Sequence, residues 1–166
     1  MKDFIFIAGA PGSGKTTISK LLAEKLGSFV IDFGKLREFH LKPDWSNESA
    51  EEEEMSFENL IFILKNYNQR GYKNVIVNDL QDFRIQQIPK LLSKINFVIF
   101  SLIVNDNAEL KKRIESERES GYKNVEKALK WNGELTKRPE IKNEYKIDNT
   151  TNAPQETLTK LLPLLS

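Results

Sequence analysis

The order of apolar and polar positions along the chain predicts strands and helices in alternation. Short apolar runs predict strands at residues 4–8, 29–32, 74–78, 97–104 and 145–148. Apolar residues at helical spacing predict helices at 18–26, from 34 to about 41, at 57–67 and at 158–165. This alternation is typical of an α/β protein with a parallel sheet and helices on both faces. We therefore expect residues 1–166 to form a single three-layer α/β/α domain around a five-stranded sheet.

The stretch between the first predicted strand and the first predicted helix carries the most specific pattern. It reads Gly9-Ala10-Pro11-Gly12-Ser13-Gly14-Lys15-Thr16-Thr17 and matches the phosphate-binding loop G-x-x-x-x-G-K-S/T without substitution. Backbone N–H groups and a helix N-terminus would surround a polyphosphate, Lys15 would reach its β- and γ-phosphates, and Thr16 would ligate Mg²⁺. We expect all of these residues to bind a nucleotide. A glycine-rich turn that matches by chance is the alternative, and the glycine spacing argues against a Rossmann dinucleotide loop.

Composition narrows the classes of partner. A net charge of +1 with 30% charged residues argues against a protein that coats nucleic acid or binds membranes through a basic surface. The chain has no cysteine, which suits a reducing compartment. No apolar run approaches the length that spans a membrane, and the first residues enter a strand rather than a cleaved signal. We therefore expect a cytoplasmic protein.

Polar residues follow the second and third predicted strands. Asp32 closes the second strand with Arg37 behind it, and Asp79 closes the third with Arg84 behind it. The carboxyl ends of parallel strands form the usual binding edge of such sheets, where a carboxylate can take a proton from a hydroxyl group or hold Mg²⁺ through its water shell. The alternative is that these residues cap helices or turns. We favour a functional role for Asp32 and Asp79 and leave both readings open for Arg84.

Two charged segments allow further predictions. The run Glu51–Glu54 is typical of a solvated helix start, where carboxylates also suit the helix dipole. Residues 106–121 form a predicted helix that is too polar to be buried along its whole length. Arg113 and Arg118 would project from a short lid at about 113–124 that closes over the phosphates. A solvated helix with Glu–Arg pairs is the alternative.

Elements spread along the whole chain match one known group of proteins. They are the phosphate loop, Gly34-Lys35-Leu36-Arg37, Val75-Ile76-Val77-Asn78-Asp79, Leu110-Lys111-Lys112-Arg113-Ile114 followed by Arg118, and Ile147-Asp148-Asn149-Thr150. In these elements the chain resembles the nucleoside monophosphate kinase group of P-loop proteins, which includes adenylate kinases and shikimate kinases. The resemblance implies phosphoryl transfer from ATP with Mg²⁺ and a sheet of order 2-3-1-4-5. It also implies an acceptor held by residues from about 33 to 70.

The resemblance implies roles for individual residues as well. Lys15 would stabilise the transferred phosphoryl group, and Arg113 and Arg118 would be lid arginines. Asp32 would be the base beside an acceptor hydroxyl group. Arg37 would bind an anionic group on the acceptor.

The segment after the third strand departs from the group. In Asp79-Leu80-Gln81-Asp82-Phe83-Arg84 the spacing from Asp to Arg is one residue longer than in bacterial adenylate kinases, and no glycine triplet of the shikimate kinase type follows the strand. We expect Asp79 beside Mg²⁺, and both Asp79 and Arg84 beside the acceptor. The identity of the acceptor stays open, although a base such as Asp32 favours a hydroxyl group, because a phosphate acceptor needs no deprotonation.

Three hypotheses of function follow from the sequence. The first is an ATP-dependent kinase that acts on a small metabolite, nucleoside or nucleotide. The second is a kinase of nucleic-acid 5′ ends, which would need a basic, aromatic-lined channel that the near-neutral net charge disfavours. The third is a P-loop ATPase without kinase activity, or a nucleotide-dependent regulatory module.

Overall fold

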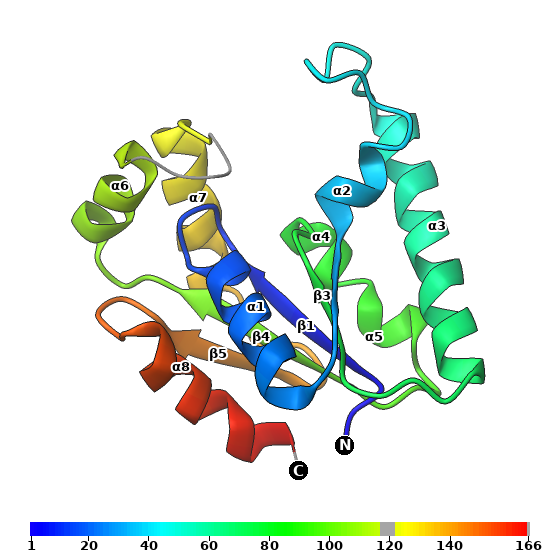
Figure 1. Cartoon of the computed structure of the whole chain (residues 1–166). Coiled ribbons are helices and arrows are strands. Elements are labelled where there is room, and N and C mark those ends of the chain that lie inside the picture. The colour runs from blue at the N-terminus through cyan, green and yellow to red at the C-terminus, as the bar shows by residue number, and fades with distance from the viewer. Residues whose placement is uncertain (117–121, 166) are drawn as a thin grey trace.

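The computed structural model describes residues 1–116 and 122–165, which are built around a parallel sheet (Figure 1). The sheet contains β1 (Phe4–Gly9), β2 (Val30–Asp32), β3 (Val75–Asn78), β4 (Phe97–Ile103) and β5 (Glu144–Asp148). All neighbouring strands pair in parallel, and their order is β2-β3-β1-β4-β5. The predicted five-stranded sheet of order 2-3-1-4-5 is therefore confirmed.

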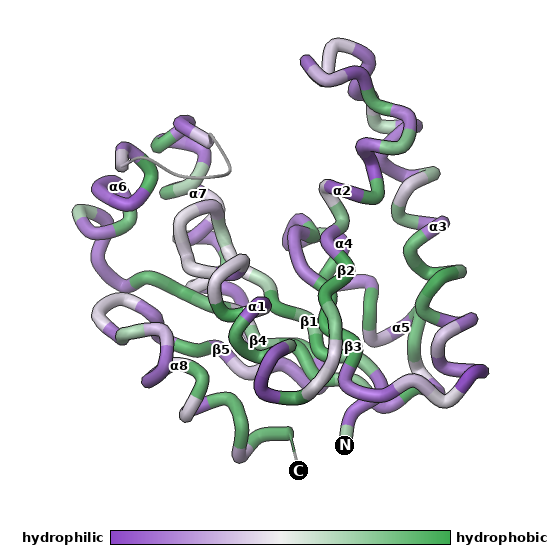
Figure 2. Tube along the Cα trace, viewed as in Figure 1, coloured by the Kyte–Doolittle hydropathy of each residue, from purple (hydrophilic) through white to green (hydrophobic). Residues whose placement is uncertain are grey.

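The central strands are apolar on both faces because helices cover both faces. Every residue of β1 and β4 is buried, and β1 lies between β3 and β4. Phe4 and Phe6 point into one core layer, whereas Ile5 and Ile7 point into the other. Figure 2 shows the hydrophobic residues that run along these strands. A strand buried on both faces cannot alternate polar with apolar side chains, which explains the continuous apolar run in the sequence.

The helices are α1 (Lys15–Leu26), α2 (Phe33–Arg37), α3 (Ala50–Gln69), α4 (Asp82–Ile85), α5 (Ile88–Leu91), α6 (Asn107–Glu115), α7 (Val125–Lys137), α8 (Pro154–Leu161) and the 3₁₀ helix η1 (Leu162–Leu165). The second core layer joins apolar residues of α1 and α8, and the first joins those of α3, α4 and α5. The predicted helix from 34 to about 41 ends earlier, at Arg37. The next helix begins where the Ser49 Oγ accepts a hydrogen bond from the Glu52 N–H at 3.1 Å.

The arrangement in space brings distant segments toward one edge of the sheet. In Figure 1 the loop before α1 lies between α6 and α7 on one side and α2 and α3 on the other. Strand register places Asp32 beside Asn78, at the ends of β2 and β3. In the described part of the chain, no helix is both long enough and apolar enough to cross a membrane.

Candidate active site

The loop between β1 and α1 has a backbone that only glycine adopts readily. Gly9, Gly12 and Gly14 have φ angles of 142°, 86° and 100°. A Cβ atom on Gly9 would lie 2.4 Å from the Ser13 Oγ and 2.6 Å from the Leu102 carbonyl oxygen. The glycines therefore allow the loop to turn tightly against β4 before α1 begins, as a phosphate cradle requires.

Lys15 is held at the mouth of this loop. Its Nζ donates hydrogen bonds to the carbonyl oxygens of Gly9 at 2.8 Å and Ala10 at 3.1 Å. The ring of Trp131, on α7, lies 5.8 Å from the same Nζ. The sequence places Trp131 on a helix face with Ala128 and Leu135, but unlike those two residues it is only half-buried. The ammonium group is thus kept where a phosphate would enter, with an aromatic face beside it.

Asn149, at the end of β5, supports the loop, and the sequence predicted no separate role for this residue. Asn149 is buried; its Nδ2 donates to the Ser13 carbonyl oxygen at 2.7 Å, and its Oδ1 accepts from the Thr157 hydroxyl group. The sequence did contain a hint of this role, because Asn149 comes directly after the fifth predicted strand, at the edge of the sheet where the other strands end. Because its amide supports the loop backbone directly, Asn149 helps to preorganise the cradle.

Arg113 connects α6 to the turn after β5 that contains Asn149. Its Nε donates to the Glu109 Oε1 at 2.8 Å, its Nη1 donates to the Asn149 carbonyl oxygen at 3.0 Å, and its Nη2 donates to that of Thr150 at 2.5 Å. In this conformation the guanidinium group holds α6 against the turn after β5. Arg118, the second predicted lid arginine, lies outside the described residues, as does part of the predicted lid at 113–124.

Asp32 and Asp79 are brought together at the ends of β2 and β3. The Asp32 Oδ1 accepts a hydrogen bond from the Lys35 N–H at 3.1 Å and so caps α2. Asp79 has a left-handed backbone with φ of 65°. Gly34 lies between them, since a Cβ atom there would be 2.6 Å from the Asp79 Oδ2 and 3.2 Å from the Asp32 Oδ1. Asp32 therefore caps α2, as the alternative reading expected, and its catalytic role stays a prediction.

The carboxyl group of Asp79 interacts electrostatically both with Asp32 and with Lys15 of the phosphate loop. Although the residue keeps an exposed face, the protein around its carboxyl group raises its pKa above the ordinary value by desolvation. The positive charges of Lys15 and Arg37 oppose this rise, and the negative charge of Asp32 adds to it. Desolvation of the carboxyl group is the largest of these influences, so the pKa of Asp79 is raised overall. A perturbed carboxyl group beside a phosphate loop is typical of functional sites.

Arg37 is buried and paired within the protein. Its Nε donates to the Glu52 Oε1 at 3.0 Å, and its Nη2 donates to the Glu52 Oε2 and, at 3.2 Å, to the Glu48 Oε1. The guanidinium carbon lies 4.9 Å from the centre of the Trp45 ring. The hydrogen bond from Arg37 lowers the pKa of Glu52 from 4.5 to about 2, with His40 adding a further hydrogen bond.

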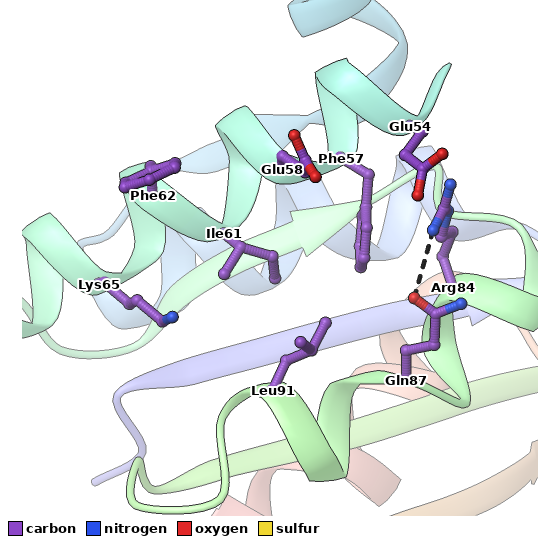
Figure 3. A pocket seen from close by; sticks show the side chains of 9 residues that line it. All are labelled: Glu54, Phe57, Glu58, Ile61, Phe62, Lys65, Arg84, Gln87 and Leu91. Atoms are coloured by element: carbon purple, nitrogen blue, oxygen red, sulfur yellow. Dashed lines mark hydrogen bonds between the residues drawn. The ribbon is translucent and has the colours of Figure 1, made fainter. Parts of the chain in front are cut away.

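Arg84 is paired in the same manner. Its Nε and Nη2 donate to the Glu53 carboxylate, the Nη2 at 2.7 Å, and its Nη1 donates to the Gln87 Oε1 at 3.2 Å. The guanidinium carbon also lies 4.6 Å from the Phe57 ring centre and 4.8 Å from that of Phe83. Figure 3 shows Arg84 and Gln87 at one end of a groove of about 390 Å³ between α3 and α5, with Phe57 on its wall.

These pairs correct the interpretation of the acidic run. Glu51 and Glu54 are exposed, as expected for a solvated helix start, but Glu52 and Glu53 are buried. The physical reason is helical spacing, because positions 52 and 53 lie one turn before the buried Ser56 and Phe57 and therefore on the inward face of α3. This helical spacing is visible in the sequence and could have predicted that Glu52 and Glu53 face inward.

The fold and this edge of the sheet together define a P-loop protein of the kinase class. Comparison with known proteins agrees: residues 5–132 match the model of the AAA domain family AAA_18, and the chain belongs to that family. A proposed adenylate kinase of Pyrococcus abyssi is 30% identical over 97% of this chain and 83% of its own length. One of Thermococcus gammatolerans is 28% identical over 97% and 84%. The resemblance to the nucleoside monophosphate kinase group of P-loop proteins is confirmed.

Solved structures share the fold at low sequence identity. A sugar kinase of Janibacter sp. superposes with a TM-score of 0.73 at 15% identity, covering 99% of this chain and 95% of that one. A gluconokinase of Sinorhizobium meliloti gives 0.69 at 15% identity, covering 97% and 90%. A thymidylate kinase of Candida albicans gives 0.64 at 19% identity, covering 98% and 90%. At these identities the likeness establishes the fold.

Proposed function

We propose that this protein transfers the γ-phosphoryl group of ATP to a hydroxyl group of a small-molecule acceptor. The observation that carries the proposal is the convergence of three side chains, Lys15 from the phosphate loop and Asp32 and Asp79 from the ends of β2 and β3. A cation for the phosphates and carboxylates for the acceptor meet at one edge of the sheet. Phosphoryl transfer depends mainly on such positioning and charge stabilisation.

Asp32 is the proposed base. One of its oxygens, Oδ1, is used to cap α2, so the other is the atom that would receive the proton. As the acceptor oxygen forms its bond to the γ-phosphorus, the bond from that phosphorus to the β–γ bridging oxygen breaks and ADP leaves. The hydroxyl proton passes to Asp32 and then to solvent. Lys15 would stabilise the negative charge on the transferred group.

The donor atoms at the loop fit Mg²⁺. Thr16 has an exposed side chain in the first turn of α1, and Asp79 contributes a carboxylate at the end of β3. Mg²⁺ prefers oxygen ligands and is usually held by one or two side chains together with water and substrate phosphates. When bound, the ion would neutralise part of the charge on the β- and γ-phosphates.

The lid arginines remain a prediction. Arg113 is bound to Glu109 and to backbone carbonyl groups, so it would need to exchange these partners before it could touch a phosphate. We therefore propose that Arg113 mainly holds α6 against the turn beside the phosphate loop. Arg118 keeps its predicted role beside the transferred group. Arg37 and Arg84 keep their predicted place at the acceptor side.

A coupled assay of ADP release tests the proposed function. Purified protein would be given ATP and Mg²⁺ with a panel of hydroxylated and phosphorylated small molecules, each compared with the rate in water alone. We expect at least one acceptor to raise the rate well above the water background, and Lys15→Ala to remove that increase. If the panel gives no increase, or if Lys15→Ala changes only nucleotide-dependent association with other molecules, the protein is not a kinase of this kind.

A further inference from the structure

Two consecutive glutamates of α3 neutralise the two arginines that are predicted to lie on the acceptor side. Glu52 pairs with Arg37 and Glu53 pairs with Arg84, and all four side chains are buried. The partners come from different elements, Arg37 from the end of α2 and Arg84 from α4. Because the glutamates are adjacent on one helix, a single segment sets the charge at both positions.

The pairs occupy the part of each guanidinium group that would otherwise bind a phosphate. In both arginines the Nε and Nη2 atoms donate to the two oxygens of one carboxylate. This two-bond arrangement is the same one that arginine uses to recognise a phosphate group. Aromatic rings beside each guanidinium group, Trp45 in one case and Phe57 and Phe83 in the other, further restrict its rotation.

A phosphate group on the acceptor would have to displace a buried carboxylate. The displaced glutamate would then keep its negative charge near the phosphate without its counterion, and an unpaired buried charge is strongly unfavourable. The half-exposed carboxylate of Glu48 also lies 3.2 Å from the Arg37 Nη2 and adds to the negative charge around this arginine. An uncharged hydroxyl group requires no such displacement.

The other charged side chains near the strand ends also disfavour an acceptor that carries a phosphate group. Asp32 and Asp79 are acidic, and the charge of Arg37, which acts on Asp79, is already balanced by its glutamates. Lys15 is committed to the phosphate loop, where it bonds two backbone carbonyl groups. Cationic charge that an anionic acceptor could use is therefore scarce among these described side chains.

We propose that Glu52 and Glu53 determine the acceptor class, and that they select hydroxylated acceptors without a phosphate group over phosphorylated ones such as nucleoside monophosphates. The inference rests on the proposed kinase function and names the substrate class of the same site. Specificity of this kind comes from a penalty against the wrong partner as much as from attraction to the right one.

Matched acceptor pairs test the inference in the unaltered protein. Each pair differs only by a phosphate group: adenosine and AMP, thymidine and thymidine monophosphate, glucose and glucose 6-phosphate, glycerol and glycerol 3-phosphate. The measurement is kcat/KM for acceptor-dependent ADP release with saturating ATP and Mg²⁺. We expect activity to be confined to unphosphorylated members, with any phosphorylated partner at least tenfold poorer.

A double variant tests whether the two glutamates are responsible. Glu52→Gln with Glu53→Gln keeps the side-chain size and removes both buried negative charges, so Arg84 loses its ion-pair partner and Arg37 keeps only the half-exposed Glu48. We expect the preference to shift at least tenfold toward the phosphorylated member of each pair. The matched control is Glu51→Gln with Glu54→Gln, which makes the same charge change at exposed positions of the same run and should leave the preference unchanged. A thermal melt establishes that each variant is folded.

The outcomes separate this inference from the function on which it rests. If neither member of any pair raises ADP release, the kinase proposal fails and the inference falls with it. If the unaltered protein prefers phosphorylated acceptors, the inference is overturned while the kinase proposal stands. If the folded double variant keeps the original preference, or if the control shifts it equally, Glu52 and Glu53 do not set the class. Should the double variant not fold, the acceptor pairs in the unaltered protein decide.

Discussion

The phosphate loop and the start of α3 both concentrate charged and polar groups, but they use them in opposite ways. In the loop, Lys15 donates hydrogen bonds to the neutral backbone oxygens of Gly9 and Ala10. At the start of α3, Glu52 and Glu53 cancel the charge of Arg37 and Arg84 inside the protein. The comparison teaches that a charged side chain at a binding edge is informative only together with the groups that it contacts.

The largest expected effect is at the loop. Replacing Lys15 by Ala removes the cation that we propose beside the transferred phosphoryl group, and we expect kcat to fall about 10³-fold, as for other electrostatic groups aimed at a transition state. Steady-state kinetics with the best acceptor measures the fall. Lys25→Ala, an exposed lysine on the same helix, is the control for charge alone. Equal losses in both variants would contradict a special role for Lys15.

The next effect concerns Asp32, the carboxylate that we propose as the base. Asp32→Asn keeps an oxygen that can still accept the Lys35 N–H and cap α2, but the amide cannot take a proton. We expect kcat to fall about 10²-fold, near the lower end for loss of a general base, with the melting temperature unchanged. A fall in melting temperature with kcat preserved would assign Asp32 to capping alone.

A smaller effect is expected from the loop backbone. Gly9→Ala would force a side chain into a left-handed position that touches Ser13 and the Leu102 carbonyl group, so we expect a loss of about 1–3 kcal/mol in the free energy of unfolding. Urea denaturation measures it. Gly133→Ala is the matched control, since nothing lies within 4 Å of the added atom and alanine favours the helix α7. Destabilisation of the control to the same degree would show that the Gly9 geometry is not special.

The smallest expected effect concerns the ion pair between Glu52 and Arg37, and it is measured as the dependence of stability on pH. Because the folded-state pKa of Glu52 is lowered from 4.5 to about 2, its contribution to stability is present above pH 4.5 and is lost as the pH falls toward 2. Urea midpoints between pH 6 and pH 2 should therefore fall less in Glu52→Gln than in the unaltered protein. Parallel curves for the two proteins would mean that the pair with Arg37 does not contribute.

Features that are set by neighbouring residues could be predicted from the sequence, whereas contacts between residues far apart in the chain could not. The strands and the phosphate loop could be predicted because burial on both faces and the glycine pattern leave marks on consecutive residues. The partners of Arg37 and Arg84 could not, since Glu52 and Glu53 are 15 and 31 residues away in sequence. Asn149 was missed as a brace for the same reason, because its partner Ser13 is 136 residues away.

The sequence by itself determined the order of strands and helices, the cradle at Gly9–Thr17, and the placement of Asp32 and Asp79 at strand ends. These depend on short-range patterns of burial and backbone freedom. Only the tertiary structure decided which charges remain available. Whether an arginine binds a ligand or a glutamate is set by distances across the folded chain, and Arg37 and Arg84 lie within hydrogen-bonding distance of buried carboxylates because α3 packs beside α2 and α4.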